Sequence, residues 1–175
     1  ALEQQTARMA GLVEQLLDLS RLDAHAIDIA PQTIDLRSRL AEVVAVAAGA
    51  RSGEIEVTVS GPDEAFVDPS VLDHIVTNLV TNALRYGSAP VRVSAAVTGG
   101  RLELSVEDAG PGVAREIEDT LFERFTRAGV SRDRVAGTGL GCAIARAYAL
   151  AHRVDLRYER AQPGGARFVV ELPSV

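Results

Sequence analysis

Lysine is absent from this sequence of 175 residues, and its 18 basic residues are all arginine. A phosphate-binding loop of the Walker type needs a lysine, so that class of nucleotide-binding protein is excluded. The single cysteine, Cys142, can form no disulfide within the chain and no cysteine-based zinc site. This sparse use of cysteine is consistent with a reducing compartment.

Long apolar runs and an excess of positive charge are also lacking. No apolar run reaches the roughly 18 residues that a membrane-spanning helix needs, and the N-terminus lacks the layout of a signal peptide. The formal net charge is −6 at pH 7, so we expect no nucleic-acid partner. The hydrophobic share of 47% and the charged share of 24% are those of a folded domain, which excludes a disordered chain.

The first residues, about 1–24, are predicted to form an amphipathic helix, because apolar residues recur there at helical spacing without proline. Leu2, Met9 and Leu16 lie seven residues apart, and Leu12 and Leu19 form the second row of a heptad pattern. This pattern favours a coiled-coil seam or a helical bundle. We interpret the segment as half of a helical hairpin; a helix that packs on its own domain is the alternative.

Beyond Pro31, helical and strand patterns are mixed. Helices are predicted from an N-cap at Asp35 to residues 52–53, and over 69–86 and 140–152. Strands are predicted over 55–59, 65–67, 90–98, 101–108, 154–159 and 166–172. Glycine turns at 99–100 and 164–165 make neighbouring strands antiparallel. We therefore expect an α+β fold, a two-layer sandwich with helices on one face of a mixed sheet, rather than a doubly wound parallel fold.

Two carboxamides are predicted to share one face of the helix over 69–86. Asn78 and Asn82 lie four residues apart, on a face separate from the apolar stripe. Asparagine is a poor residue for a helix interior, so two asparagines on one helical face indicate a role other than helix formation. The carboxamide oxygens suit a hard cation such as Mg²⁺, which takes further oxygens from water and substrate phosphates. A solvated polar face is the alternative.

The strand over 101–108 ends in an aspartate that is predicted to point inward. Asp108 has the same parity as Leu104 and Val106, so its carboxylate faces the core. A buried carboxylate needs donors, and it suits an exocyclic amine such as that of adenine. Gly110 and Gly112 follow, and they leave room for a flat ligand to approach the backbone. An ordinary turn after a strand would use the same residues.

A glycine-rich string runs directly into the last predicted helix. The string consists of Gly137, Thr138, Gly139, Leu140 and Gly141. Free amides at a helix start, together with the helix dipole, form an anion site that needs no lysine. A Rossmann fingerprint is rejected, because Cys142 stands where its third glycine would fall and no strand precedes it. The polar segment over 126–136 is of the kind that closes over a ligand, with an ordinary mobile loop as the alternative.

Taken in order, the motifs Asn-x-x-x-Asn, Asp-x-Gly-x-Gly, Phe-x-x-Phe and Gly-x-Gly-x-Gly resemble the ATP-binding domain of sensor histidine kinases. These kinases belong to a wider group with gyrase, heat-shock chaperone and mismatch-repair ATPases. Residues 8–21 resemble the second helix of that family's dimerisation and phosphotransfer hairpin. The resemblance covers essentially the whole chain. It implies a Bergerat-type fold, with residues 1–26 as the hairpin helix and residues 27–175 as the ATP-binding catalytic domain.

The resemblance implies ATP and Mg²⁺ as cofactors and assigns residues to them. Asn82 resembles the Mg²⁺ ligand, and Asn78 resembles a second polar group near metal and phosphate. Asp108 resembles the adenine reader, and Arg85 stands near the phosphates where the family usually has lysine. The other residues implied in ATP binding are Tyr86, Gly110, Gly112, Phe125, Gly137, Thr138, Gly139, Leu140 and Gly141. Phe122 matches the same aromatic motif as Phe125, and for both the alternative is core packing.

Several features depart from the family pattern, among them Arg153 and Val154, which replace the glycines that usually follow the histidine at position 152. Ala166, in the string 165–168, stands where a hydroxyl is expected near the adenine. In addition, none of His25, His74 and His152 lies in the sequence context of the family's phosphoacceptor. The acceptor histidine is therefore expected on a phosphotransfer hairpin outside this sequence.

The resemblance implies a protein-histidine kinase: the catalytic part of a two-component sensor that transfers the γ-phosphate of ATP to a histidine, for relay to a response regulator aspartate. Gyrase and chaperone relatives have a water-activating Glu where this chain has Asn78, and an amide cannot serve as that base, so slow hydrolysis is implied. The implied whole protein is a homodimer whose kinase part is cytoplasmic and whose membrane contact lies in other segments. The alternatives are a serine kinase of the anti-sigma-factor type and a module that senses nucleotide without transferring phosphate.

Overall fold

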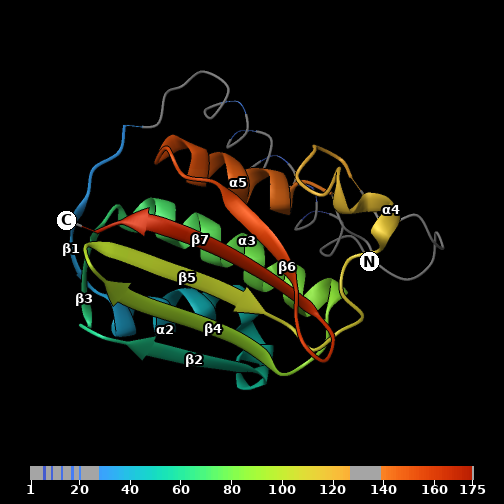
Figure 1. The fold of residues 1–175 in the computed structure, drawn as a ribbon, viewed down its shortest axis with the longest axis horizontal. Helices are drawn as coiled ribbons and strands as arrows, with labels where there is room; N and C mark the ends of the chain where they lie inside the picture. Colours follow the sequence, from blue (N-terminus) through green and yellow to red (C-terminus); the bar gives the residue numbers. More distant parts are fainter. Residues whose placement is uncertain are drawn as a thin grey trace.

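The computed structural model in Figure 1 describes residues 28–126 and 139–174, together with Thr6, Met9, Val13, Leu17 and Ser20. Those five N-terminal residues are helical, which agrees with the predicted first helix. Met9, Val13 and Leu17 are each more than half exposed. The rest of the heptad pattern and His25 lie outside the described residues. Among the residues that are described, no helix is both long and apolar enough to cross a bilayer.

The body of the molecule has two layers, a five-stranded sheet and a layer of helices (Figure 1). The sheet has the order β2 (Ile55–Ser60), β4 (Val91–Thr98), β5 (Arg101–Glu107), β7 (Ala166–Pro173) and β6 (Leu156–Arg160). Strands β2 and β4 are parallel, and the other neighbours are antiparallel. The helices α2 (Leu36–Ala48), α3 (Pro69–Tyr86) and α5 (Gly141–Ala151) cover one face. The predicted two-layer α+β sandwich is confirmed.

The core lies between the sheet and helix α3, which contacts both α2 and α5. Alternate residues of the central strands face this core, among them Val93 of β4 and Leu104 of β5. The predicted apolar stripe of α3 is buried, and it consists of Leu72, Ile75, Val76, Leu79, Val80 and Ala83. This packing fixes the rotation of α3 about its axis and so determines which residues of α3 face the site.

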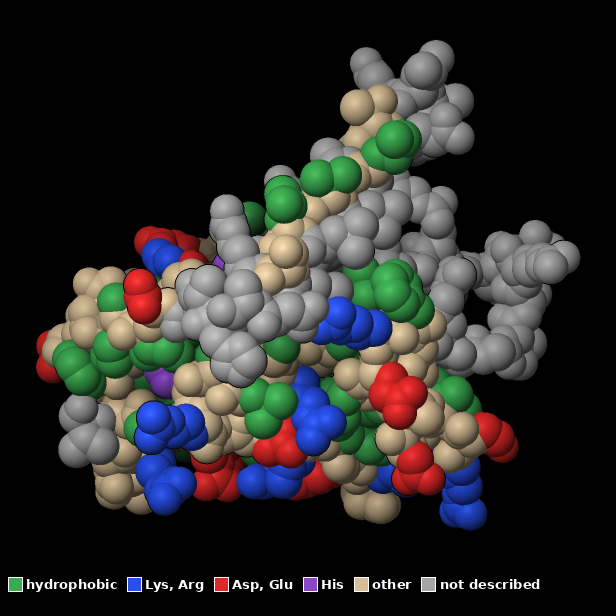
Figure 2. Space-filling model, turned by 90° about the horizontal axis from the view of Figure 1, so that it is seen from above, with side chains coloured by type: hydrophobic (Ala, Val, Ile, Leu, Met, Phe, Trp, Pro, Cys, Tyr) green, Lys and Arg blue, Asp and Glu red, His purple; other side chains and the backbone are tan. Residues whose placement is uncertain are grey.

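The outer face of the sheet carries arginine and glutamate in cross-strand ion pairs. Arg92 lies 3.2 Å from Glu56 on β2 and 3.5 Å from Glu107 on β5. Arg167 pairs with Glu159 at 2.9 Å. Figure 2 shows charged side chains of both signs interspersed on the surface of the molecule. A face of this kind is solvated, whereas the opposite face of the sheet packs against the helices.

Helix starts follow the capping residues in the sequence. Asp35 accepts a hydrogen bond from the backbone N–H of Ser38 at 2.7 Å, as predicted for an N-cap. Asp68 caps α3 by accepting from the backbone N–H groups of Ser70 and Val71, with Pro69 at the first helical position. The second cap is buried, and it fixes the direction in which α3 leaves the preceding strand.

Three features differ from the elements that the sequence predicts. Helix α2 ends at Ala48 rather than at 52–53, because Gly49 adopts a positive φ of 54° and a 3-10 helix, η1 (Gly49–Glu54), follows. Strand β1 (Gln32–Asp35) was not predicted; it pairs antiparallel with β3 (Glu64–Val67) in a separate small sheet. The short helix α4 (Arg115–Glu118) was also missed.

Candidate nucleotide-binding site

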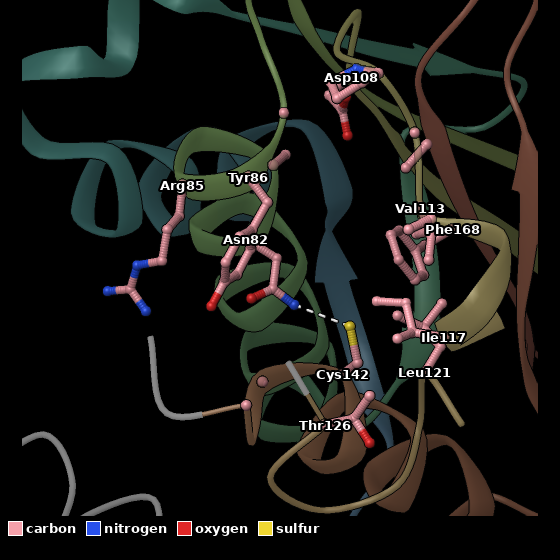
Figure 3. A pocket seen from close by; sticks show the side chains of 18 of the residues that line it. Asn82, Arg85, Tyr86, Asp108, Val113, Ile117, Leu121, Thr126, Cys142 and Phe168 are labelled. Carbon is pink, nitrogen blue, oxygen red and sulfur yellow. Dashed lines mark hydrogen bonds between the residues drawn. The ribbon is translucent and has the colours of Figure 1, made fainter. Parts of the chain in front are cut away.

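A cavity of about 580 Å³ lies between α3, the segment that follows β5 and the start of α5 (Figure 3). Asp108 stands at one end of the cavity, and Cys142 and Thr126 stand at the other. Helix α3 contributes Asn82, Arg85 and Tyr86 to one side. The cavity therefore joins, in one space, residues that are far apart in the sequence.

Asp108 supplies a buried carboxyl group at its end of the cavity. It follows the last residue of β5 and is only 6% exposed, as its predicted inward parity requires. Its Oδ1 accepts a hydrogen bond from the backbone N–H of Gly110 at 2.8 Å. Burial raises the pKa of the Asp108 carboxyl, and neighbouring backbone N–H donors oppose this only in part. A ligand that donates a hydrogen bond here would offset the cost of desolvating the carboxylate.

Glycines pack directly against Asp108 and leave no room for side chains. A Cβ at Gly87 would lie 2.3 Å from the Asp108 Cγ, and one at Gly165 would lie 1.8 Å from the Asp108 carbonyl oxygen. A Cβ at Gly110 would lie 2.8 Å from both Asp108 Oδ1 and the Cα of Gly87. Gly110 therefore serves close packing of the backbone around the carboxyl group and is not among the residues that line the cavity, whereas Gly112 lines it.

An apolar wall faces helix α3 across the cavity. It is made by Val113, Ile117, Leu121 and Phe168 (Figure 3). On the opposite side, Tyr86 is 45% exposed at the end of α3. Sequence reasoning did not single out Val113, Ile117 and Leu121, and of these three only Ile117 lies in a helix, α4. Phe168 comes from the distant strand β7 and belongs to the string 165–168, which the resemblance places near the adenine.

Asn82 and the start of α5 form the other end of the cavity. The Asn82 Nδ2 donates a hydrogen bond to the Cys142 Sγ at 3.0 Å. Gly139, with a positive φ of 71°, and Gly141 also line this end. Burial raises the pKa of the Cys142 thiol to about 12, against a smaller opposing effect of the Asn82 hydrogen bond. The thiol is therefore neutral at physiological pH.

Arginines line the cavity as well. Arg85, which the resemblance places near the phosphates, belongs to the last turn of α3 and lines the cavity. Arg160, which sequence reasoning missed, donates from Nη2 to the Val113 carbonyl oxygen at 2.9 Å and pairs with Glu118. It therefore ties strand β6 to the apolar wall. Arg115 of α4 is a third basic residue at the cavity. Their positive charge favours an anionic ligand.

Four of the residues that the resemblance implies in ATP binding do not line the cavity. Asn78 is buried, and its Nδ2 donates to the His74 carbonyl oxygen within α3 at 2.8 Å. Leu140 is fully buried in the core, and Phe125 is 62% exposed with a positive φ of 63°. Together with Gly110, these residues are not among those that line the cavity. Gly137 and Thr138 lie outside the described residues, and so do residues 127–136 of the polar segment predicted over 126–136.

Phe122 follows the core-packing alternative. Its ring meets that of Phe168 edge-on, with centroids 6.3 Å apart. The guanidinium of Arg146 lies 5.2 Å from the centroid of the Phe122 ring. Phe122 thus supports the apolar wall from behind, through Phe168.

A magnesium ion at this site would have few protein ligands. In the described part of the chain, no group of three or more His, Cys, Asp or Glu residues could hold a metal ion. Mg²⁺ is commonly held by one or two protein oxygens, with water and substrate phosphates completing its coordination. The Asn82 carboxamide, at the cavity end that carries the glycines of α5, fits that requirement.

The chain resembles known proteins in sequence over this whole region. Residues 67–175 match the family described as histidine kinase-, DNA gyrase B-, and HSP90-like ATPase. The chain is 34% identical over 169 residues to the signal transduction histidine-protein kinase AfsQ2 of Streptomyces coelicolor. The matched region covers 97% of this chain and 31% of that protein. The chain spans less than half the length of the first curated relatives it matches.

The solved structures that resemble this chain are also of histidine kinases. The histidine kinase domain of the Escherichia coli osmosensor EnvZ is 34% identical, with a TM-score of 0.62, over 83% of this chain and 91% of that domain. Full-length ShkA in complex with AMPPNP is 30% identical, with a TM-score of 0.80, over all of this chain and 38% of that one.

The two-layer fold is that of a histidine kinase domain, and the chain belongs to the family of histidine kinase-, DNA gyrase B-, and HSP90-like ATPases. Its relatives within that family are sensor histidine kinases. The family resemblance and the fold class predicted from the sequence are both confirmed. Membership of this family implies an ATP-binding domain.

Proposed function

We propose that the cavity binds ATP together with Mg²⁺, and that the chain is the catalytic part of a two-component sensor histidine kinase. It transfers the γ-phosphate to a histidine outside this chain, for relay to an aspartate of a response regulator. The observation that carries the proposal is the single cavity that runs from the buried carboxyl of Asp108 to Asn82 and the glycines at the start of α5.

The Asp108 end suits the adenine base. A carboxylate accepts hydrogen bonds only, so it selects a ligand with an amine at this position. The apolar wall that includes Ile117 and Phe168 faces the α3 side across a space in which a flat ring can lie. Gly112 lines the same end without a side chain. Base recognition therefore follows from one acceptor and one apolar surface.

The Asn82 end suits the phosphates. The first backbone N–H groups of α5 have no partner within the helix and carry the positive end of its dipole. Gly139 and Gly141 allow a ligand close to this backbone, and Arg85 adds positive charge. Asn82 would hold Mg²⁺ through its carboxamide oxygen, and the bound ion would neutralise charge on the phosphates. Asn78, which bonds within α3, would act only indirectly.

The acceptor histidine is proposed to lie on a separate hairpin. His74 stacks on Tyr148 with ring centroids 4.2 Å apart, and His152 ends α5. Neither of these two described histidines lines the cavity. Residues 1–26 are proposed to be the second helix of the dimerisation and phosphotransfer hairpin, and residues 27–175 the ATP-binding domain. The exposed apolar side chains of Met9, Val13 and Leu17 support this division.

The partners of the whole protein follow from the same proposal. They are a second copy of the chain, which pairs through the hairpin, and a response regulator that receives the phosphate. The kinase part is proposed to be cytoplasmic, in a sensor anchored to the membrane by segments outside this chain.

The test is a transfer assay with a separate acceptor. The chain is incubated with γ-labelled ATP, Mg²⁺ and a purified hairpin that carries the acceptor histidine of a sensor kinase from this family. We expect label on the hairpin that depends on Mg²⁺ and is lost in acid, because the phosphorus–nitrogen bond of phosphohistidine is labile in acid. The matched control is the hairpin with that histidine changed to alanine.

Two outcomes of this assay would contradict the proposal. Acid-stable label on serine would support a serine kinase of the anti-sigma-factor type. Tight ATP binding with no label on any hairpin would support a module that senses nucleotide without transferring phosphate.

A further inference from the structure

The carboxamide of Asn82 is held by the first two residues of helix α5, rather than by its own helix. Its Nδ2 donates to the Cys142 Sγ at 3.0 Å. On another side, a Cβ at Gly141 would lie 2.9 Å from Oδ1 and 3.1 Å from Nδ2 of Asn82. The backbone of α5 thus comes so close to the carboxamide that only glycine fits between them without displacing it.

Asn78 shows what Asn82 would do without this contact. The two residues lie one turn apart on α3, and the Nδ2 of Asn78 donates to the carbonyl oxygen of His74, four residues earlier. That arrangement keeps the side chain against its own helix. Asn82 instead points its amide nitrogen across to α5, and its oxygen lies on the side away from Cys142 (Figure 3).

We propose that Cys142 is a positioning residue for nucleotide binding: by accepting the Asn82 Nδ2–H, its sulfur fixes the direction of the carboxamide oxygen, which would hold Mg²⁺. This inference rests on the proposed role of Asn82 as the metal ligand. Cys142 acts through Asn82 and has no contact of its own with the metal ion.

The chemistry of the two side chains suits this role. The Cys142 sulfur is a weak hydrogen-bond acceptor, and the Asn82 Nδ2 is the donor end of the carboxamide. A carboxamide has a donor end and an acceptor end, so fixing the nitrogen also fixes the oxygen.

The test compares ATP affinity with Mg²⁺ and with a chelator in place of Mg²⁺, by titration calorimetry on the whole chain. The ratio of the two dissociation constants is the gain that the metal provides. In Cys142→Ala we expect this gain to fall by about three- to tenfold, with affinity in chelator unchanged. In Cys142→Ser, which retains a neutral acceptor, we expect the gain to stay within about twofold of the original.

The link through Asn82 is tested by a double-mutant cycle. Asn82→Ala should remove most of the metal gain, and adding Cys142→Ala to it should cause no further loss. Gly141→Ala is a second, steric route to the same result, because its Cβ would displace the carboxamide. The added Cβ of Gly141→Ala would meet only the end of the Asn82 side chain, so this variant should fold even if Cys142→Ala does not.

The outcomes separate this inference from the proposed function. If Asn82→Ala keeps the full metal gain, Asn82 is not the ligand, and both its proposed role and the inference fail. If Asn82→Ala loses the gain while Cys142→Ala keeps it, only the inference is overturned. It is equally overturned if Cys142→Ala weakens binding to the same extent with and without metal, or if the two substitutions add in full.

Discussion

Asp68 and Asp108 are both buried aspartates at the ends of strands, yet they have different surroundings. Asp68 is 5% exposed and Asp108 is 6% exposed. Both oxygens of Asp68 accept backbone hydrogen bonds: Oδ1 from Ser70 at 2.8 Å, and Oδ2 from Ala30 at 2.8 Å. The carboxyl of Asp108 instead faces the cavity, with Gly110 as the backbone donor to Oδ1.

The difference shows that burial alone does not mark a functional carboxylate. Asp68 has its donors within the fold, so it stabilises the start of α3 and the chain that enters from residue 30. Burial raises the pKa of Asp108, because desolvation disfavours the charged carboxylate. A ligand amine that donates a hydrogen bond can offset this desolvation cost. The two aspartates therefore differ in their hydrogen-bond donors: the fold supplies them to Asp68, whereas a ligand would complete them at Asp108.

The largest effect that we expect from this comparison is on stability, at Asp68. Asp68→Ala removes the cap of α3 and leaves the part-buried N–H of Ala30 without its acceptor. We expect the free energy of unfolding to fall by about 3 kcal/mol, which urea titration monitored by circular dichroism will measure. A loss below about 1 kcal/mol would show that water replaces the carboxylate at this position.

The next effect is on ATP affinity, at Asp108. Asp108→Asn keeps the shape of the side chain but directs a donor, in part, towards the amine of adenine. We expect ATP binding to weaken by about 2 kcal/mol, roughly thirtyfold, in titration calorimetry. GTP carries an oxygen where ATP carries that amine, so its affinity should fall less or should rise. Unchanged ATP affinity would reject the placement of adenine at this end of the cavity.

The smallest effect is on the stability of the Asp108→Asn protein, and it depends on pH. Since the folded-state pKa of Asp108 is raised, its protonated form favours folding. That contribution is complete below the unfolded pKa and is lost as pH rises through the folded pKa. At neutral pH we therefore expect Asp108→Asn to leave stability equal or higher, by less than about 1 kcal/mol.

Urea titrations of the Asp108→Asn variant and the unchanged protein at pH 4 and at pH 7 measure this effect. The advantage of the variant should be larger at pH 7. A variant that is clearly less stable at pH 7 would mean that Asp108, like Asp68, is a structural residue.

Local patterns predicted the features that depend on periodicity. The buried stripe of α3 and the inward direction of Asp108 both follow from residue spacing within one element, and both are present. The capping role of Asp35 is equally local. By contrast, β1 is a four-residue polar strand whose existence depends on pairing with β3, and its own sequence gave no signal.

The site was predicted in part, for the same reason. Eleven of the thirteen implied ATP-binding residues are described by the structure, and seven of these line the cavity: Asn82, Arg85, Tyr86, Asp108, Gly112, Gly139 and Gly141. Helical spacing alone could not separate Asn78 from Asn82, because the difference lies in the contact with α5. The role of Gly110 depends on the approach of Gly87 from another segment. The described structure thus adds the long-range contacts, while the assignment of these residues to ATP stays a prediction.

The place of strand β7 in the sheet has a consequence for biosynthesis. It is the last strand of the described residues, yet it lies between β5 and β6, and it carries Ala166 and Phe168 into the cavity. A nascent chain therefore cannot complete the proposed nucleotide pocket until residues 166–173 have left the ribosomal exit tunnel. Premature termination before residue 166 would leave a polypeptide with no complete pocket.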